Sequence, residues 1–315
     1  MGEYTGHRNA DVVIDIGEKK VCSKDVYLFS FNYGGELNAV KKGVINRGKA
    51  VFELVNRGGI YIAGYYQDSI ISYLSEPFYL PDNSGEIEFI NADRSDLGTV
   101  RLNRKFNVKW TMIPFVEAIN GAVIEGSMEP NFIQSDTLTI LGSNVDYYKT
   151  IDFENEKKYR YYRYNPVDCL EIRLAELSFC NRNDGSTNVL GVPYGYLSDS
   201  STCDETNWAN AFDLNIRTNL NAPKKSWVAM DMGKPVNVDQ INILSRNHLN
   251  IVEPNNEYEL FCFDQGWFSL GRLKSTDYHI EFENVPKGAI LWLRNHTQGR
   301  EERIFRYEND QQVWY

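Results

Sequence analysis

The chain has 315 residues, of which 42% are hydrophobic and 24% charged, and its net charge is −10. This length is enough for two or three domains. The acidic balance argues against a nucleic-acid partner, which would require a clustered basic face. No apolar run approaches the roughly 20 residues of a membrane span. The 20 Tyr and 16 Phe favour strands, so the composition points to an all-β protein.

The first 90 residues show strand patterns separated by turn residues. The expected strands cover residues 12–16, 26–31, 50–55 and 60–66. Glycine and asparagine lie between them, as is typical of turns. Residues 36–44 could instead form about two helical turns between glycines. This pattern predicts an N-terminal β-sandwich over residues 1–90.

A second unit is expected over residues 91–183. Its strand patterns cover residues 121–127, 137–141, 159–164 and 170–179. In the last of these the apolar residues change from even to odd positions after Leu174. One extra residue flips the face of a strand, so the sequence predicts a β-bulge at Leu174–Ala175. A polar run near residues 181–188 then leads into a third unit, residues 184–315.

The ends of the second and third units match without gaps at an offset of 130 residues. The matching pairs are Asn165 with Asn295, Glu171 with Glu301, and Arg173 with Arg303. Both segments consist of two strand patterns joined by a polar loop. This internal repeat favours related folds for the two units.

Two motifs carry a resemblance to a known family. Residues 211–218 read Ala-Phe-Asp-Leu-Asn-Ile-Arg-Thr, and residues 227–233 read Trp-Val-Ala-Met-Asp-Met-Gly. Together they resemble the central motif of galactose-binding-like domains, also called discoidin or coagulation-factor C-type domains. Residues 159–164 and 174–179 are similar to the closing strands of that family. The resemblance implies an all-β chain of tandem β-sandwiches, in which two discoidin-like jelly rolls follow the N-terminal sandwich.

The whole chain further resembles the C-terminal region of secreted bacterial proteins that carry a transglutaminase-like domain upstream. The resemblance implies a secreted, periplasmic or cell-surface location, although the first residues show no signal segment. It transfers no catalytic residue, because Cys22 lacks the surrounding block that such a nucleophile would need.

The family often holds a structural Ca²⁺ between an Asp-Gly-Asn-x-x-Thr turn and a glutamate near the last strand. Asp213, Asn215 and Thr218 fall on the matching positions, and oxygen-rich turns suit this hard cation. Two departures weaken the match: Leu214 replaces the glycine, and Arg306 lies 130 residues after Glu176. The alternative is an ordinary turn closed by the aspartate side chain.

Sugar-binding members of the family use loops at one end of the sandwich. There an aromatic ring stacks on the sugar, while polar side chains bind its hydroxyls. The candidates here are Trp208, Arg246, Asn247, His248, Trp267 and Arg300. The alternatives are a structural turn for Arg246 and Asn247, a core position for Trp267, and a plain surface role for the histidine.

No nucleophile elbow, zinc-protease motif or phosphate-binding loop is present in the sequence. Together with this absence, the resemblance implies a non-catalytic, extracellular carbohydrate-binding or accessory protein of glycan or glycoprotein processing. A protein–protein adhesion or structural module is one alternative, favoured by flat apolar loop tips without a polar-rimmed pocket. A remote glycoside hydrolase is another, favoured by a cleft with two carboxylates about 5–10 Å apart.

Overall fold

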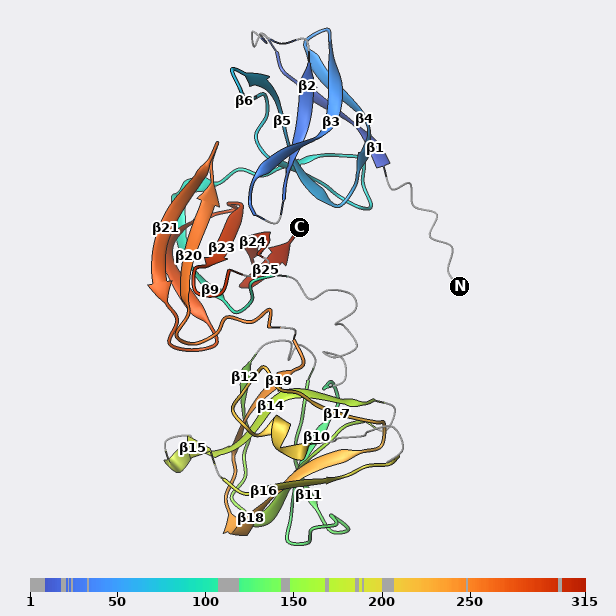
Figure 1. The fold of residues 1–315 in the computed structure, drawn as a ribbon, viewed down its shortest axis with the longest axis vertical. Coiled ribbons are helices and arrows are strands. Elements are labelled where there is room, and N and C mark those ends of the chain that lie inside the picture. The colour runs from blue at the N-terminus through green and yellow to red at the C-terminus, as the bar shows by residue number, and fades with distance from the viewer. Residues whose placement is uncertain are drawn as a thin grey trace. The chain divides into compact units, whose positions relative to one another are not determined.

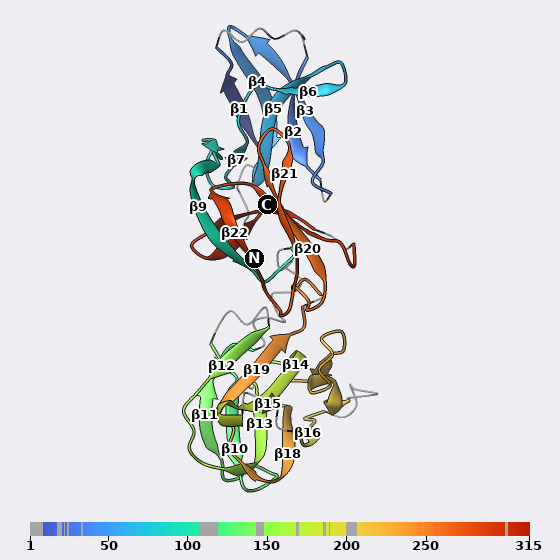
Figure 2. The same ribbon diagram turned by 90° about the vertical axis from the view of Figure 1, so that its left-hand side faces the viewer.

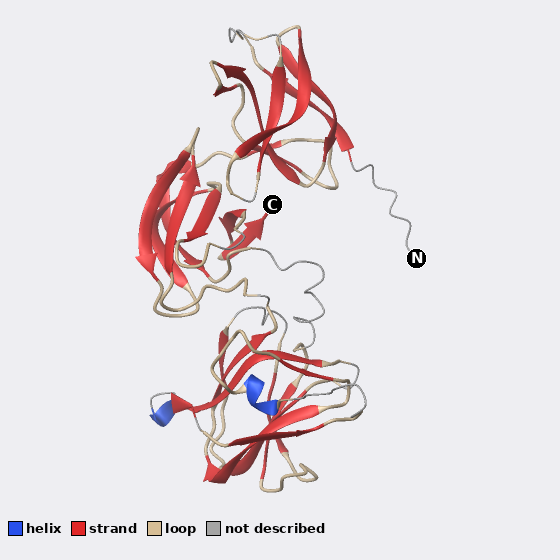
Figure 3. Ribbon diagram, viewed as in Figure 1, coloured by secondary structure: helices blue, strands red, loops and turns tan. Residues whose placement is uncertain are grey.

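The chain is all-β. The structure is a computed structural model, and it describes residues 9–17, 21, 23, 25–32, 34–106, 119–142, 148–167, 170–184, 187–188, 190–199, 207–247, 249–299 and 302–315. These residues form strands and short 3-10 helices and contain no α-helix, which confirms the predicted class (Figure 3). Within them no helix is long and apolar enough to cross a membrane.

The chain folds into two compact units, which Figure 1 colours along the sequence. Unit 1 combines Met1–Asn107 with Val252–Tyr315, and unit 2 is Val108–Ile251. The chain therefore enters unit 1, leaves it to form unit 2, and returns to complete unit 1.

The N-terminal part of unit 1 is one eight-stranded sheet. Its strands are β1 (Asn9–Asp15), β2 (Val26–Phe31), β3 (Leu37–Asn46), β4 (Lys49–Asn56), β5 (Gly59–Gln67), β6 (Ile70–Tyr73), β7 (Phe78–Leu80) and β8 (Glu88–Phe89). The order is β1-β4-β3-β2-β5-β7-β8, with β6 beside β5. Alternate side chains such as Val12, Leu28 and Phe52 enter its core.

The helical alternative for residues 36–44 is wrong, because this segment belongs to β3. β3 pairs with β2 on one side and with β4 on the other. A Cβ on Gly43 would lie 2.4 Å from the Phe52 ring, so the sheet needs a glycine here. Tertiary pairing on both edges thus decides the conformation of a segment whose local pattern was ambiguous.

The C-terminal part of unit 1 contains two sheets. One has the order β21-β20-β23-β24-β25, and the other pairs β22 with β9. The strands are β9 (Asp93–Leu102), β20 (Glu257–Phe263), β21 (Trp267–Lys274), β22 (Ile280–Lys287), β23 (Leu291–Asn295), β24 (Ile304–Glu308) and β25 (Gln311–Trp314). Tyr258, Leu260, Phe282 and Phe305 lie in the core of this part.

The boundaries between the two units fall near residues 107 and 252, whereas the sequence predicted boundaries near residues 90 and 183. β9 pairs with β22, which joins residues 93–102 to the C-terminal part of the chain. The partner strands are more than 170 residues apart, and no local sequence pattern reports such a pairing. The segment after β9 is therefore inserted into unit 1.

Trp267 connects the two parts of unit 1. Its indole Nε1 donates a hydrogen bond to the Gly35 carbonyl oxygen at 2.6 Å. Its ring contacts Phe31 at 5.5 Å and Trp292 at 5.5 Å between centroids. Gly35 has a φ of +72°, and a Cβ there would lie 3.1 Å from the Trp292 ring. Trp267 was a candidate sugar-binding residue, and its packing agrees with the alternative of a core position.

Replacing Trp267 by alanine is expected to destabilise unit 1 by about 2–3 kcal/mol, below the value for a fully buried tryptophan because this ring is only partly buried. Trp267→Phe should lose only about 1 kcal/mol, since it keeps the ring but not the hydrogen bond. Urea unfolding measures both values. An equal loss of unfolding free energy in Trp267→Ala and Trp267→Phe would show that the packing of the ring does not stabilise unit 1.

Unit 2 is a sandwich of two five-stranded sheets (Figure 2). One has the order β11-β10-β13-β18-β16, and the other has β12-β19-β14-β15 with β17 beside β14. The strands are β10 (Val123–Ser127), β11 (Asp136–Ile140), β12 (Lys149–Asp152), β13 (Tyr159–Asn165), β14 (Ile172–Asn181), β15 (Thr187–Asn188), β16 (Val192–Tyr196), β17 (Leu220–Ala222), β18 (Trp227–Val236) and β19 (Gln240–Ser245). The 3-10 helices η2 (Arg182–Asp184) and η4 (Trp208–Ala211) lie in the connections.

Strands from both sides of residue 183 build this sandwich. β13 pairs with β18, and β14 pairs with β19. The register of β14 shifts between Leu174 and Glu176, so the predicted bulge is confirmed. The two segments of the internal repeat differ in how their strands pair. β23 and β24 are neighbours in one sheet, whereas β13 and β14 lie in different sheets.

Candidate functional site

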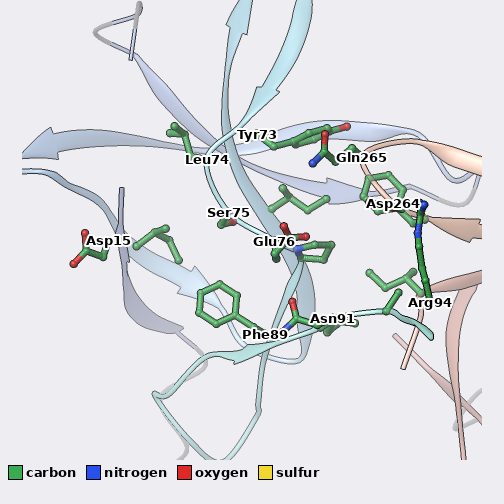
Figure 4. A pocket seen from close by; sticks show the side chains of 17 residues that line it. Asp15, Tyr73, Leu74, Ser75, Glu76, Phe89, Asn91, Arg94, Asp264 and Gln265 are labelled. Atoms are coloured by element: carbon green, nitrogen blue, oxygen red, sulfur yellow. Dashed lines mark hydrogen bonds and ion pairs between the residues drawn. The ribbon is translucent and has the colours of Figure 1, made fainter. Parts of the chain in front are cut away.

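A pocket of about 550 Å³ lies in unit 1, between the two parts of that unit (Figure 4). Its wall comes from six places in the sequence: the end of β1, β5, residues 73–77, residues 89–92 with Arg94, residues 263–265, and Ile290. This volume is within the range of about 300–1,000 Å³ that is usual for small-molecule sites.

The floor of the pocket is apolar and its rim is polar. Ile62 and Ile290 are each about 1% exposed and belong to the apolar cluster that joins the two parts of unit 1. Asp15, Asn91 and Gln265 contribute polar side chains to the lining. A polar rim over an apolar floor is the arrangement by which proteins orient small polar ligands.

Three aromatic rings line the pocket: Tyr73, Phe89 and Phe263. Phe89 is 50% exposed, and it meets the buried Phe78 ring edge to face at 6.1 Å between ring centroids. Tyr73 meets Phe263 edge to face at 6.3 Å. Burial raises the pKa of Tyr73, so its hydroxyl keeps the proton and can donate a hydrogen bond. Phe89 offers a flat apolar surface, and Tyr73 adds a polar tip.

The charges of the pocket are partly neutralised. Arg94 forms an ion pair with Asp264 along one side, as the dashed line in Figure 4 marks. Asp15 accepts a hydrogen bond from the backbone N–H of Gly17 at 2.9 Å. Figure 4 places Glu76 in the middle of the lining, and its side chain is exposed. The pocket therefore has an acidic balance, with carboxylates available to accept hydrogen bonds from hydroxyl groups.

The loop after η4 in unit 2 contains the residues predicted to bind Ca²⁺. The Thr218 hydroxyl oxygen lies 2.8 and 3.0 Å from the two carboxylate oxygens of Asp213. It also lies 2.8 Å from the Asn215 carbonyl oxygen. Since the hydroxyl has one proton, it cannot donate to all three oxygens at once. The Asn215 N–H donates to Asp213 Oδ1 at 3.0 Å and the Thr218 N–H donates to the Asn215 carbonyl oxygen at 3.0 Å, as in a turn closed by the aspartate side chain.

Glu176, on β14, extends this oxygen cluster. Its side chain is 1% exposed, and neither carboxylate oxygen has a hydrogen-bond partner within the described residues. Burial and then the charge of Asp213 raise the pKa of Glu176 to about 8, while the nearby N–H groups of Leu214 and Asn215 oppose the rise. A buried carboxylate avoids the cost of burying its charge either by holding a proton, as the raised pKa favours, or by binding a cation.

These residues fit a hard cation only in part. Among the described residues, no group of three or more acidic, histidine or cysteine side chains could hold a metal ion. A cation here would be held by the carboxylates of Glu176 and Asp213, by the neutral oxygens of Asn215 and Thr218, and by water. Ca²⁺ accepts such a mixture, because it takes 6–8 oxygen ligands in flexible geometry.

The other predicted ligand residues that the structure describes are divided between the two units. Arg246 and Asn247 follow β19 in unit 2, where Asn247 is 3% exposed. Its side chain donates to the Ser245 carbonyl at 3.1 Å and accepts from the Leu249 N–H at 2.6 Å, as in a structural turn. His248 and Arg300 lie outside the described residues.

The two predicted tryptophans belong to different units. Trp208 begins η4 in unit 2, where its ring lies against Gly195. Trp267 is in unit 1 and packs as described above. Its hairpin nevertheless reaches the pocket, through the turn residues Asp264 and Gln265.

None of the residues predicted to bind a ligand lines the pocket, and the role of Glu176 was not predicted from the sequence. The pocket residues come from segments between positions 14 and 290, and no motif unites them. Glu176 had a usable signal, because it lies between Ala175 and Leu177 in a strand of buried residues. An acid in such a run is either paired or functional.

Comparison with known proteins gives no match: no family model, no curated protein and no solved structure corresponds to the chain.

Proposed function

We propose that the protein is a non-catalytic carbohydrate-binding protein and that the pocket of unit 1 holds the sugar. One observation supports this most strongly: the pocket combines a half-exposed aromatic ring, an apolar floor and a polar rim. A sugar ring has the matching chemistry, with C–H groups on its faces and hydroxyls around its edge.

In this proposal each part of the lining has a separate task. Phe89 packs against the C–H face of the sugar. Glu76 and Asp15 accept hydrogen bonds from hydroxyls, and the amides of Asn91 and Gln265 both donate and accept. The acidic balance disfavours uronic acids and other anionic sugars, because like charges repel.

We further propose that Glu176, Asp213, Asn215 and Thr218 hold a structural Ca²⁺ in unit 2. The buried carboxylate of Glu176, close enough to Asp213 for that charge to raise its pKa, supports this assignment. The cation would fasten the loop after η4 to β14. The arrangement is in line with a discoidin-like unit, which together with the resemblance of the whole chain favours a secreted, periplasmic or cell-surface protein.

Protein–protein adhesion is the second candidate function. A row of valines runs across the outer face of the N-terminal sheet, where Val51 is the direct partner of both Val13 and Val44. Val13 is 47% and Val44 is 62% exposed. Exposed apolar patches of this kind often mark contacts with other proteins.

The pocket proposal predicts selective loss of glycan binding in Phe89→Ala. Removing an aromatic stacking surface should cost about 1–1.5 kcal/mol, or roughly tenfold in Kd. A glycan array identifies the best neutral oligosaccharide, and calorimetric titration with that sugar measures the loss. Phe268→Ala is the matched control, because Phe268 is 52% exposed in the same unit and does not line the pocket.

Three results would count against the proposal. Wild-type protein that binds no glycan would exclude carbohydrate recognition, and unchanged affinity in Phe89→Ala would exclude the pocket. Release of reducing sugar from a polysaccharide, abolished in Glu76→Gln, would instead indicate a glycoside hydrolase.

A further inference from the structure

The sheet of unit 2 that contains β13, β18 and β16 carries a second aromatic surface, on the side away from the sandwich core. Trp227 is at its centre. Tyr196 stacks on Trp227 at 6.2 Å between centroids with 25° between the planes. Tyr194 and Phe132 meet the same indole edge to face, at 5.7 and 5.6 Å. We call this group the outer aromatic face.

Strand alternation explains why these rings point outward. In β18, Val228 and Met230 belong to the core of the sandwich, so Trp227, Ala229 and Asp231 lie on the opposite face. Tyr194 and Tyr196 follow the same alternation on the neighbouring strand β16. Figure 2 shows β16 and β18 side by side in unit 2.

Part of the face is covered and part is open. Phe132, in the loop between β10 and β11, is 5% exposed and has a φ of +54°. Its loop is held in place by Tyr194, whose hydroxyl donates to the Pro130 carbonyl oxygen at 3.1 Å. Tyr196 remains 51% exposed on β16. The loop thus forms one side of a surface whose open side is the Tyr196–Trp227 stack.

The charges on the face are paired internally. Arg163 contacts the Glu125 carboxylate at 2.5 Å, and its guanidinium lies 4.5 Å from the Phe132 ring. Arg160 binds both carboxylate oxygens of Asp231, at 2.8 and 2.9 Å. Two arginines against two carboxylates leave no net charge. The side chain of Arg160 is 43% exposed, so its remaining N–H groups can still reach a ligand.

We propose that the outer aromatic face is a second carbohydrate-binding site, specific for neutral sugars. The Tyr196–Trp227 stack offers a flat apolar surface for a pyranose ring. The exposed Arg160–Asp231 pair offers donors and acceptors to its hydroxyls. An anionic glycan would require cations that are not already paired, and both arginines of this face are paired with carboxylates. The site is in unit 2 and shares no residue with the pocket of unit 1, so the protein would bind glycans at two places.

The test uses the full-length protein with Phe89→Ala, in which binding at the pocket is expected to be about tenfold weaker. This variant and the double variant Phe89→Ala/Tyr196→Ala are applied to an array of neutral oligosaccharides, with heparin and polygalacturonate as anionic probes. The pocket variant should retain some neutral glycans, and Tyr196→Ala should weaken their binding about tenfold. Phe89→Ala/Tyr66→Ala is the matched control, because Tyr66 is 45% exposed in unit 1.

Trp227→Ala could prevent folding, so Tyr196→Leu provides the second variant. It keeps an apolar side chain on β16 but removes the flat ring, and it should lose affinity like Tyr196→Ala. Unchanged affinity in both variants would overturn the proposal. So would a Phe89→Ala protein that binds no neutral glycan, or one that binds only the anionic probes. A Tyr196-dependent dimer in light scattering without glycan binding would show that a second copy occupies the face.

Discussion

Calcium is expected to raise the unfolding temperature of unit 2, and Glu176→Gln should abolish the effect. Ca²⁺ at 100 times its Kd would stabilise the folded state by about 2.7 kcal/mol. The buried Glu176 carboxylate, which has no hydrogen-bond partner within the described residues, would supply the charge that attracts the cation. Calorimetric scans in Ca²⁺ and in a chelator measure the shift.

The pH dependence separates this binding from a general salt effect. The cation binds the ionised carboxylate, and the pKa of Glu176 is raised to about 8. The stabilisation by Ca²⁺ should therefore grow as pH rises from 6 toward 8. Glu156→Gln, at an exposed position of unit 2, is the matched control and should keep the full response. Equal stabilisation of Glu176→Gln and wild type would contradict the assigned site.

Unit 1 is expected to lose stability as pH rises from about 4.5 to about 7, through Glu302. This side chain is 6% exposed, and burial raises its pKa from 4.5 to about 7. The folded state therefore holds the proton more tightly than the unfolded state does, and ionisation costs stability as pH rises through the folded pKa. At about 1.4 kcal/mol per pKa unit, the loss is on the order of 3 kcal/mol.

Glu302→Gln tests this expectation. The amide oxygen can still accept from the Asn295 backbone N–H, as the carboxylate does, but it does not titrate. Urea unfolding of the variant should show a flatter profile between pH 4.5 and 7, with the largest gain over wild type at neutral pH. Glu283→Gln, at an exposed position of β22, controls for loss of a surface charge. A Glu302→Gln profile parallel to wild type would contradict the role of burial.

Features that depend on neighbouring residues were predictable. The strand patterns of residues 26–31 and 159–164 correspond to β2 and β13, because alternating apolar residues show which face of a strand is buried. The bulge after Leu174 was predictable for the same reason, since a change of parity requires an extra residue. The turn containing Asp213, Asn215 and Thr218 was identified through its resemblance to the family's Asp-Gly-Asn-x-x-Thr motif, and the structure brings the three residues together.

Features that depend on distant residues were not predictable. The pocket is assembled from segments around Asp15, Glu76, Phe89 and Asp264, and nothing in their local patterns relates them. The expected sugar-binding loops were chosen by analogy, and the structure instead gives Asn247 a structural turn and Trp267 a packed position. Aromatic residues show this limit well, because the same residue types serve as core and as binding surface.

The sequence by itself therefore determined the all-β class, most strand positions and the oxygen-rich loop. Each of these depends on the types and spacing of residues that are only a few positions apart. Only the tertiary structure decided that β9 pairs with β22, that unit 2 is inserted between them, and that Glu176 faces the loop of Asp213. The physical reason is that strand pairing and burial are set by the free energy of the whole packed chain. Many local patterns are compatible with several partners, and packing selects one.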